Sequence, residues 1–161
     1  MFSFLKKESG IEVKAPVNGE IFPIESVNDP VFSEKMMGDG IAIKYAGGDV
    51  VAPVTGKITS VILPSCHAFG IRCESGLDVL VHVGLDVVKL KGEGFQLLKK
   101  KGEMVHQGEA VIKVDYDLLK DKGLDLITPI VITNSNEFLL NQKAQGQAES
   151  GRTNLFVAQK K

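Results

Sequence analysis

The sequence predicts an all-β fold, an antiparallel β-sandwich or barrel with short connecting helices. The chain of 161 residues contains 17 glycines, six prolines and no tryptophan, and its stretches rich in valine and isoleucine are short. Turn residues separate these stretches at intervals too brief for the crossover connections that parallel strands need, so neighbouring strands should pair antiparallel. Helix signals are few and short.

The strands are predicted in order from runs of β-branched and aromatic residues bounded by turn residues. They cover residues 11–14, 19–24, 41–45, 50–52, 56–63, 68–74, 77–83, 110–114, 130–132 and 154–158. Two short helices are predicted as connectors. Residues 117–122 begin at the capping residue Asp117 and are followed by Gly123, and residues 95–100 are long enough for one short helical segment.

One internal repeat is visible, because residues 15–21 (APVNGEI) recur as residues 52–58 (APVTGKI). Both copies place a proline and a glycine around an apolar residue, which is typical of a strand that enters a turn and leaves it as another strand. Duplication and independent selection of good turn chemistry explain the repeat equally well. In either case we expect two similar β units that face one core.

Composition predicts a single domain over residues 11–161, preceded by a flexible N-terminal segment of residues 1–10. Apolar residues make up 43% of the chain, enough to bury a core, and no linker or composition shift divides it. Nineteen basic and 20 acidic residues leave a net charge of −1, and no basic block is long enough to bind nucleic acid. We expect a monomer.

Several features indicate a cytoplasmic location. The chain lacks a run of about 18 apolar residues that would insert into a membrane, and Met1 to Lys7 is too short for a membrane tether. The two cysteines, Cys66 and Cys73, are expected to remain thiols in a reducing cytosol.

The placement of the histidines is informative because the chain has only three. Period-2 alternation turns residues 77, 79, 81 and 83 toward the core and places His82 on the opposite face with Leu80. His67 opens the neighbouring strand, and a hairpin turn at residues 75–76 would bring it opposite a position near Gly84. The two imidazoles should then meet, whereas His106 lies in a polar turn and is expected to be solvated.

A histidine pair is compatible with a metal site, with acid–base catalysis or with a covalent phosphohistidine. A closed zinc site needs three or four protein ligands, and the cysteines do not form a Cys-x-x-Cys motif. The sequence has no Walker A loop, kinase signature or Gly-x-Ser-x-Gly motif, so a nucleotide donor has no binding loop. Elimination favours the covalent histidine, but only weakly.

Longer motifs around these histidines resemble the glucose-type enzyme IIA family of the bacterial phosphoenolpyruvate:sugar phosphotransferase system. They are residues 35–43 (KMMGDGIAI), 51–54 (VAPV), 66–69 (CHAF), 81–86 (VHVGLD), 90–95 (LKGEGF) and 128–131 (TPIV). Their order and spacing agree with the family over roughly residues 11–158. Several long motifs in register are far more specific than one short pattern.

The resemblance implies a β-sandwich and a phosphotransferase component with a phosphohistidine intermediate. On the motif match, His82 accepts a phosphoryl group from the carrier protein HPr and transfers it to a cysteine of the IIB domain of a glucose-type membrane permease. His67 would stabilise the phosphoryl group, and Ser65 would orient His67. No cofactor is required, although a regulatory partner that supplies further ligands could complete a zinc site at His67 and His82.

The resemblance also implies a surface that binds protein partners. Asp29 and Asp86 match acidic positions that meet a basic surface of HPr. An apolar ring around the site matches Val31, Phe32, Met36, Met37, Leu80 and Val88. The chain departs from the family pattern at Leu80, where an aromatic residue is common, and at Cys66.

Two other classes of protein remain as alternatives. A carrier module of the biotinyl or lipoyl type shares the Ala-Pro-Val-x-Gly turn, but Lys57 and Lys113 do not lie in the hairpin setting that such a module needs. A zinc-dependent hydrolase with His67 and His82 as ligands would lack a third ligand and a general base.

Overall fold

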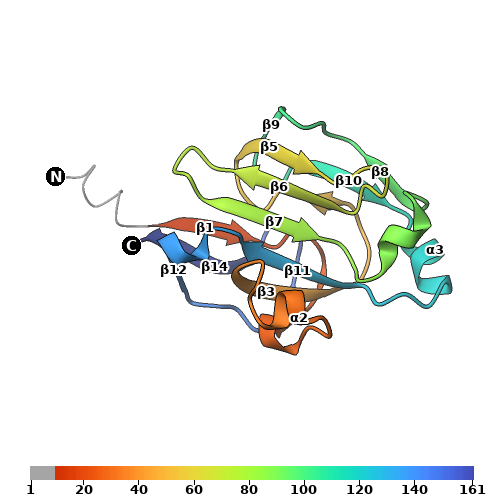
Figure 1. Cartoon of the computed structure of the whole chain (residues 1–161), viewed down its shortest axis with the longest axis horizontal. Coiled ribbons are helices and arrows are strands. Elements are labelled where there is room, and N and C mark those ends of the chain that lie inside the picture. The colour runs from red at the N-terminus through yellow and green to blue at the C-terminus, as the bar shows by residue number, and fades with distance from the viewer. Residues whose placement is uncertain (1–9) are drawn as a thin grey trace.

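Residues 10–161, which the computed structural model describes, form short β-strands joined by tight turns and brief helical segments (Figure 1). The strands are β1 (Ile11–Lys14), β2 (Gly19–Pro23), β3 (Asp39–Tyr45), β4 (Val50–Val51), β5 (Gly56–Val61), β6 (Ala68–Arg72), β7 (Asp78–His82), β8 (Phe95–Leu97), β9 (Met104–Val105), β10 (Ala110–Val114), β11 (Ile127–Ile132), β12 (Phe138–Asn141), β13 (Gly146–Ala148) and β14 (Asn154–Lys160). The helices are α2 (Pro30–Ser33) and α3 (Tyr116–Asp121), and the 3-10 helices are η1 (Ile24–Ser26), η2 (Val87–Leu90) and η3 (Ser135–Glu137).

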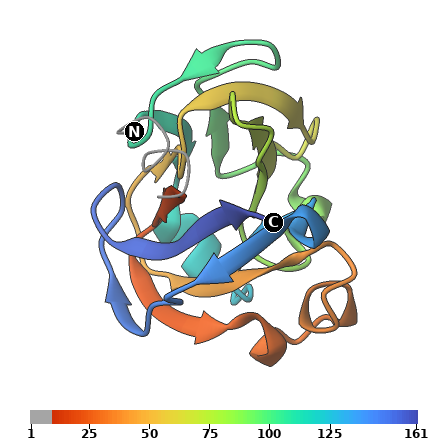
Figure 2. The ribbon, with the colours of Figure 1, turned by 90° about the vertical axis from the view of Figure 1, so that its left-hand side faces the viewer.

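The strands form one large and two small sheets. The eight-stranded sheet has the order β13-β2-β3-β11-β7-β6-β5-β9, and the three-stranded sheets have the orders β1-β14-β12 and β4-β10-β8. Every strand pair in the described part of the chain is antiparallel. Figure 2 shows β14 and β12 between β5 above and β2 below. The predicted antiparallel β-sandwich with short helices is confirmed.

One large apolar core lies between the sheets. In β7, Val79 and Val81 are buried in this core, whereas Leu80 and His82 on the opposite face are only half-buried. This is the alternation that the sequence predicts. A second, smaller cluster covers part of that opposite face and consists of Ile24, Val27, Phe32, Ala42, Leu85 and Val131, with Leu80 and Ile127 packed against it.

The two copies of the repeat occupy equivalent positions. The backbone N–H of Lys14 donates to the carbonyl of Pro53 (3.0 Å), and that of Val51 donates to the carbonyl of Pro16 (2.9 Å). Strands β13, β2, β3 and β11 form one half of the large sheet, and β9, β5, β6 and β7 form the other half in mirrored order. The repeat therefore marks the start of two similar β units, as expected.

Some predicted elements differ from the structure. Residues 95–100 do not form the predicted helix, because Phe95 and Leu97 turn toward the core as alternate residues of β8, which pairs with β10. Helix α3 is capped by Asp115, whose carboxylate accepts the N–H of Leu118, so the predicted cap Asp117 lies in its first turn. The sequence did not indicate β9, β12, β13 or α2.

Both cysteines are free, as predicted, and burial raises the pKa of the Cys73 thiol to about 11. No helix within residues 10–161 is long and apolar enough to cross a membrane. The predicted flexible segment of residues 1–10 lies, apart from Gly10, outside the described residues.

Candidate functional site

His67 and His82 lie side by side at one end of the hairpin formed by β6 and β7. His82 ends β7 and pairs with Ala68, the first residue of β6, so His67 lies one position before that pair. The N–H of Val83 donates to the carbonyl of His67 (2.8 Å) and closes the hairpin at this end. The Nε2 atoms of the two imidazoles are 3.2 Å apart, and their rings meet edge to face. The predicted meeting of the two histidines is confirmed.

The hydrogen bonds around the pair define which nitrogen of each neutral ring carries a proton. Nδ1 of His82 lies 2.9 Å from the carbonyl oxygen of Gly84, which can only accept, so Nδ1 is the donor. Nε2 of a neutral His82 therefore keeps its lone pair. His67 then donates through its own Nε2, and its Nδ1 accepts from the hydroxyl of Ser65 at 2.7 Å. The series of hydrogen bonds that runs from Ser65 through His67 and His82 to Gly84 makes Nε2 of His82 the ring nitrogen that can act as a nucleophile.

Burial keeps both histidines uncharged at neutral pH. His67 is only 3% exposed, and burial, with a smaller contribution from His82, lowers its pKa from 6.5 to about 4. Burial also lowers the pKa of His82, although its hydrogen bond to Gly84 and the nearby carboxylate of Asp29 oppose this shift. An uncharged imidazole is the form that can attack an electrophile.

The low pKa of His67 makes folding stability depend on pH. As the pH falls, the unfolded chain binds a proton at His67 at a higher pH than the folded chain does. The stabilisation of the folded state by neutral His67 is therefore fully present above pH 6.5 and is lost as the pH falls toward 4. We expect the free energy of unfolding to decrease by about 3 kcal/mol over that range. Denaturant unfolding of the wild-type chain and of His67→Gln between pH 7 and pH 4.5 measures it. The same pH dependence in both chains would contradict this assignment.

Ser65 is placed to orient His67. It is 1% exposed, and its hydroxyl is the hydrogen-bond partner of His67 Nδ1. Without it, the imidazole can adopt the other tautomer, in which Nε2 no longer donates toward His82. For the phosphoryl transfer that the sequence resemblance implies, we expect Ser65→Ala to slow the rate about tenfold and Ser65→Thr to restore most of it. Rates of transfer, with nitrogen NMR of the His67 tautomer, test this. An equal loss in both variants would indicate a packing role alone.

Exposed apolar side chains lie on three segments next to the histidines: α2 and the turn after it, the loop before His67, and η2 after Gly84. We call them the apolar rim, and they are Val31, Met36, Met37, Ile62, Leu63 and Val88. Ile62 and Leu63 were not predicted as site residues, because the sequence placed them in a strand that in fact ends at Val61. Pro64, directly after them, was the signal that the strand ends earlier.

Phe32 differs from the other residues of the predicted apolar ring. It is buried, and its ring lies 5.1 Å from that of His82 between centroids. Phe32 therefore packs against His82 rather than lying exposed. Leu80, half-buried on β7, packs against the same small cluster. From the other side, the ring of Phe95 lies 6.4 Å from that of His67.

The two predicted acidic residues flank this site. The carboxylate of Asp29 caps α2 by accepting the N–H of Val31 (3.0 Å), and its charge influences the pKa of His82. Asp86 precedes η2 in a left-handed conformation (φ 59°), four residues after His82. His106 is exposed, as predicted.

No group of three or more His, Cys, Asp or Glu side chains within residues 10–161 is arranged to hold a metal ion. The Nε2 atoms of His67 and His82 would supply two nitrogen ligands to zinc, so further ligands would have to come from a partner.

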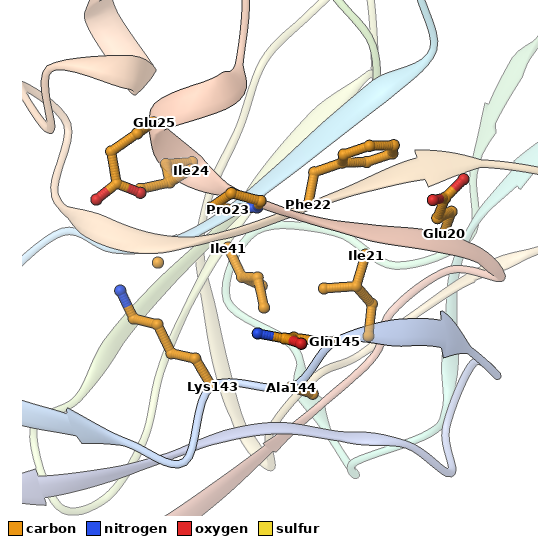
Figure 3. A pocket seen from close by; sticks show the side chains of 11 residues that line it. Glu20, Ile21, Phe22, Pro23, Ile24, Glu25, Ile41, Lys143, Ala144 and Gln145 are labelled. Carbon is orange, nitrogen blue, oxygen red and sulfur yellow. The ribbon is translucent and has the colours of Figure 1, made fainter.

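A separate hollow of about 350 Å³ lies between β2, β3 and the segment before β13 (Figure 3). Its lining contains Ile21, Ile41 and Lys143 but no histidine or cysteine. At one end, Lys35 lies 3.3 Å from Glu25 and 3.6 Å from Asp39, which also binds Lys143 at 2.8 Å. These ion pairs hold the segment that carries Met36 and Met37 against the sheet.

Fold and site together define a β-sandwich protein with two adjacent histidines, an unprotonated Nε2 on His82 and an exposed apolar rim. The chain belongs to the EIIA 1 family of the phosphoenolpyruvate-dependent sugar phosphotransferase system, whose model matches residues 11–138. This confirms the resemblance found in the sequence. The chain is therefore a component of a sugar phosphotransferase system, and neither the biotinyl or lipoyl module nor the zinc hydrolase is supported.

Individual relatives agree with this assignment. The chain is 43% identical over 146 residues to a glucose-specific EIIA component from Halalkalibacterium halodurans, covering 90% of this chain and 84% of that protein. It is 43% identical over 150 residues to a glucoside-specific EIICBA component from Staphylococcus carnosus, covering 93% of this chain but only 22% of that longer protein. The solved structure of glucose permease IIA from Mycoplasma capricolum is 36% identical, with a TM-score of 0.84 over 93% of this chain and 95% of that one.

Proposed function

We propose that this chain is a cytoplasmic phosphoryl carrier, in which His82 accepts a phosphoryl group from phosphorylated HPr and transfers it to a cysteine of the IIB domain of a sugar permease. The observation that supports this most directly is the hydrogen bond from Nδ1 of His82 to Gly84, which leaves Nε2 as a lone-pair nitrogen beside His67. The name of the Staphylococcus relative joins A, B and C components in one protein, which favours a IIB domain as the acceptor.

The proposed transfer consists of two displacements at phosphorus. First, the lone pair of His82 Nε2 attacks the phosphorus, the bond to the donor imidazole breaks, and its electron pair returns to the donor nitrogen. Then a cysteine thiolate attacks, and the bond from phosphorus to His82 breaks in the same way. Because both nucleophiles are protein side chains, the transfer needs no resident cofactor. Positioning and charge stabilisation account for most of the catalysis of phosphoryl transfer.

His67 is the group placed to stabilise that charge. Its Nε2–H donates to His82 in the free protein, and a phosphoryl group on His82 would present an oxygen to the same donor. The apolar rim would exclude water when a partner docks, which strengthens this hydrogen bond. We further propose that Asp29 and Asp86 meet basic side chains of HPr at the edge of this contact.

Incubation with phosphoenolpyruvate, enzyme I and HPr tests the proposed function. We expect a mass gain of one phosphate, stable in alkali and labile in acid, which is the behaviour of a phosphohistidine. Omission of HPr is the control, and it should prevent the gain. A chain that gains no phosphate from the complete mixture, or gains one that is stable in acid, would contradict the proposal.

A further inference from the structure

Two adjacent methionines, Met36 and Met37, lie on the apolar rim. Met36 is 70% exposed and Met37 38% exposed, so dissolved oxidants can reach both side chains. Met104 is exposed to a similar extent, 66%, but it lies on β9 at the edge of the large sheet, three strands from β7. Within residues 10–161, exposed methionines therefore occupy two regions: the turn after α2, the helix whose Phe32 packs against His82, and the edge strand β9, three strands from β7.

The backbone around Met36 and Met37 is held by contacts that do not involve the thioethers. The N–H of Met37 donates to the carbonyl of Val31 (3.2 Å), and the N–H of Gly38 donates to that of Lys35 (3.2 Å). The ion pairs of Lys35 with Glu25 and Asp39 anchor the same turn. A chemical change at either sulfur would thus alter the surface near His82 while the turn keeps its fold.

We propose that Met36 and Met37 form a peroxide-sensitive modification site, at which oxidation to methionine sulfoxide weakens docking of the phosphoryl donor. The inference rests on the proposed function. A sulfur lone pair attacks one oxygen of hydrogen peroxide, a sulfur–oxygen bond forms, and the oxygen–oxygen bond breaks. The second oxygen leaves as hydroxide and, after proton transfer, as water. Each sulfur is oxidised by two electrons, and each peroxide molecule is reduced to water.

The expected effect is on docking rather than on the chemical step. A sulfoxide oxygen is a hydrogen-bond acceptor, and an apolar contact offers it no donor when water is excluded. We expect the apparent KM for phosphorylated HPr to rise about tenfold, which corresponds to about 1.4 kcal/mol. The rate at saturating HPr should change little, because the histidine pair and its hydrogen bonds are untouched. Methionine sulfoxide reductases reverse the modification, so treatment with them should restore the KM.

The test uses the full chain carrying Cys66→Ser, because the half-buried thiol beside His67 is also oxidisable. Three proteins are compared: this parent, the parent with Met36→Leu and Met37→Leu, and the parent with Met104→Leu. Each is assayed for transfer from phosphorylated HPr before and after hydrogen peroxide, and peptide mass analysis locates the added oxygens. The KM should rise in the parent and in the Met104→Leu protein, and it should stay constant in the double methionine variant.

Three results would overturn this inference but leave the proposed function intact. The first is oxygen added at Met36 and Met37 with no change in KM, and the second is a rise in KM in the double methionine variant equal to that in the parent. The third is oxidation of Met104 while Met36 and Met37 stay intact. An untreated parent that accepts no phosphoryl group would instead overturn the proposed function, and this inference with it.

Discussion

Replacement of His82 by alanine is expected to abolish phosphoryl acceptance. Among the described residues at the apolar rim, His82 carries the unprotonated nitrogen Nε2, whose lone pair accepts from His67 in the free protein, and alanine removes this nucleophile. His67 is not expected to take over, because it is 3% exposed, its Nε2 carries the proton, and its unprotonated Nδ1 faces the buried hydroxyl of Ser65. Mass measurement after incubation with phosphoenolpyruvate, enzyme I and HPr should show no added phosphate.

His106→Ala is the matched control, since His106 is exposed and lies in a turn between β9 and β10. This variant should gain one phosphate at the wild-type rate. Circular dichroism should establish that both variants are folded. Undiminished labelling of His82→Ala, or a loss of labelling in His106→Ala, would refute the site assignment.

Replacement of His67 by alanine is expected to separate the two halves of the transfer. His82 keeps its hydrogen bond to Gly84 and hence its nucleophilic Nε2, so His67→Ala should still gain one phosphate. Transfer to the IIB cysteine should fall by a factor of about 10²–10³, the usual cost of losing one hydrogen-bond donor to a developing charge. Single-turnover transfer from the isolated phosphorylated protein to a IIB domain measures this step directly.

His67→Gln is the informative companion variant, because an amide N–H in a similar position can donate to a phosphoryl oxygen without titrating. It should recover part of the rate that His67→Ala loses. Transfer to IIB at the wild-type rate in His67→Ala would show that His67 does not stabilise the phosphoryl group. Complete loss of acceptance would instead assign His67 a role in the first step.

The hairpin that carries the histidines could be predicted from the sequence to within one residue of its register. In residues 77–83 every odd position is apolar and the even positions are Asp78, Leu80 and His82, and in a strand this pattern places His82 off the core. The predicted turn at residues 75–76 would place His67 opposite Gly84, but the structure pairs Ala68 with His82, which shifts the register by one residue. The shift arises because the N–H of Cys73 donates to the carbonyl of Leu77 around a turn of residues 74–76. Local pattern was sufficient for the face of the strand and for the approach of the two histidines, whereas the exact register depended on the hydrogen bonds of the turn.

Other features could not be read from local pattern. Phe95 lies in a stretch that is equally compatible with a short helix, and only its pairing opposite Val114 makes it a strand residue. Phe32 looked like an exposed contact residue, yet α2 folds back so that its ring packs against His82. Both outcomes depend on partners distant in the chain, whose positions are decided by packing of the whole core.

The sequence by itself determined the antiparallel β architecture, the repeated β unit, the family and the convergence of His67 and His82, because periodicity, turn chemistry and long motifs are properties of contiguous residues. Only the tertiary structure decided the state of the site. The distance of 3.2 Å between the two Nε2 atoms, the proton on Nδ1 of His82 and the lowered pKa of His67 all arise from side-chain packing and burial. These properties depend on the folded environment of the two side chains, which local sequence pattern does not specify.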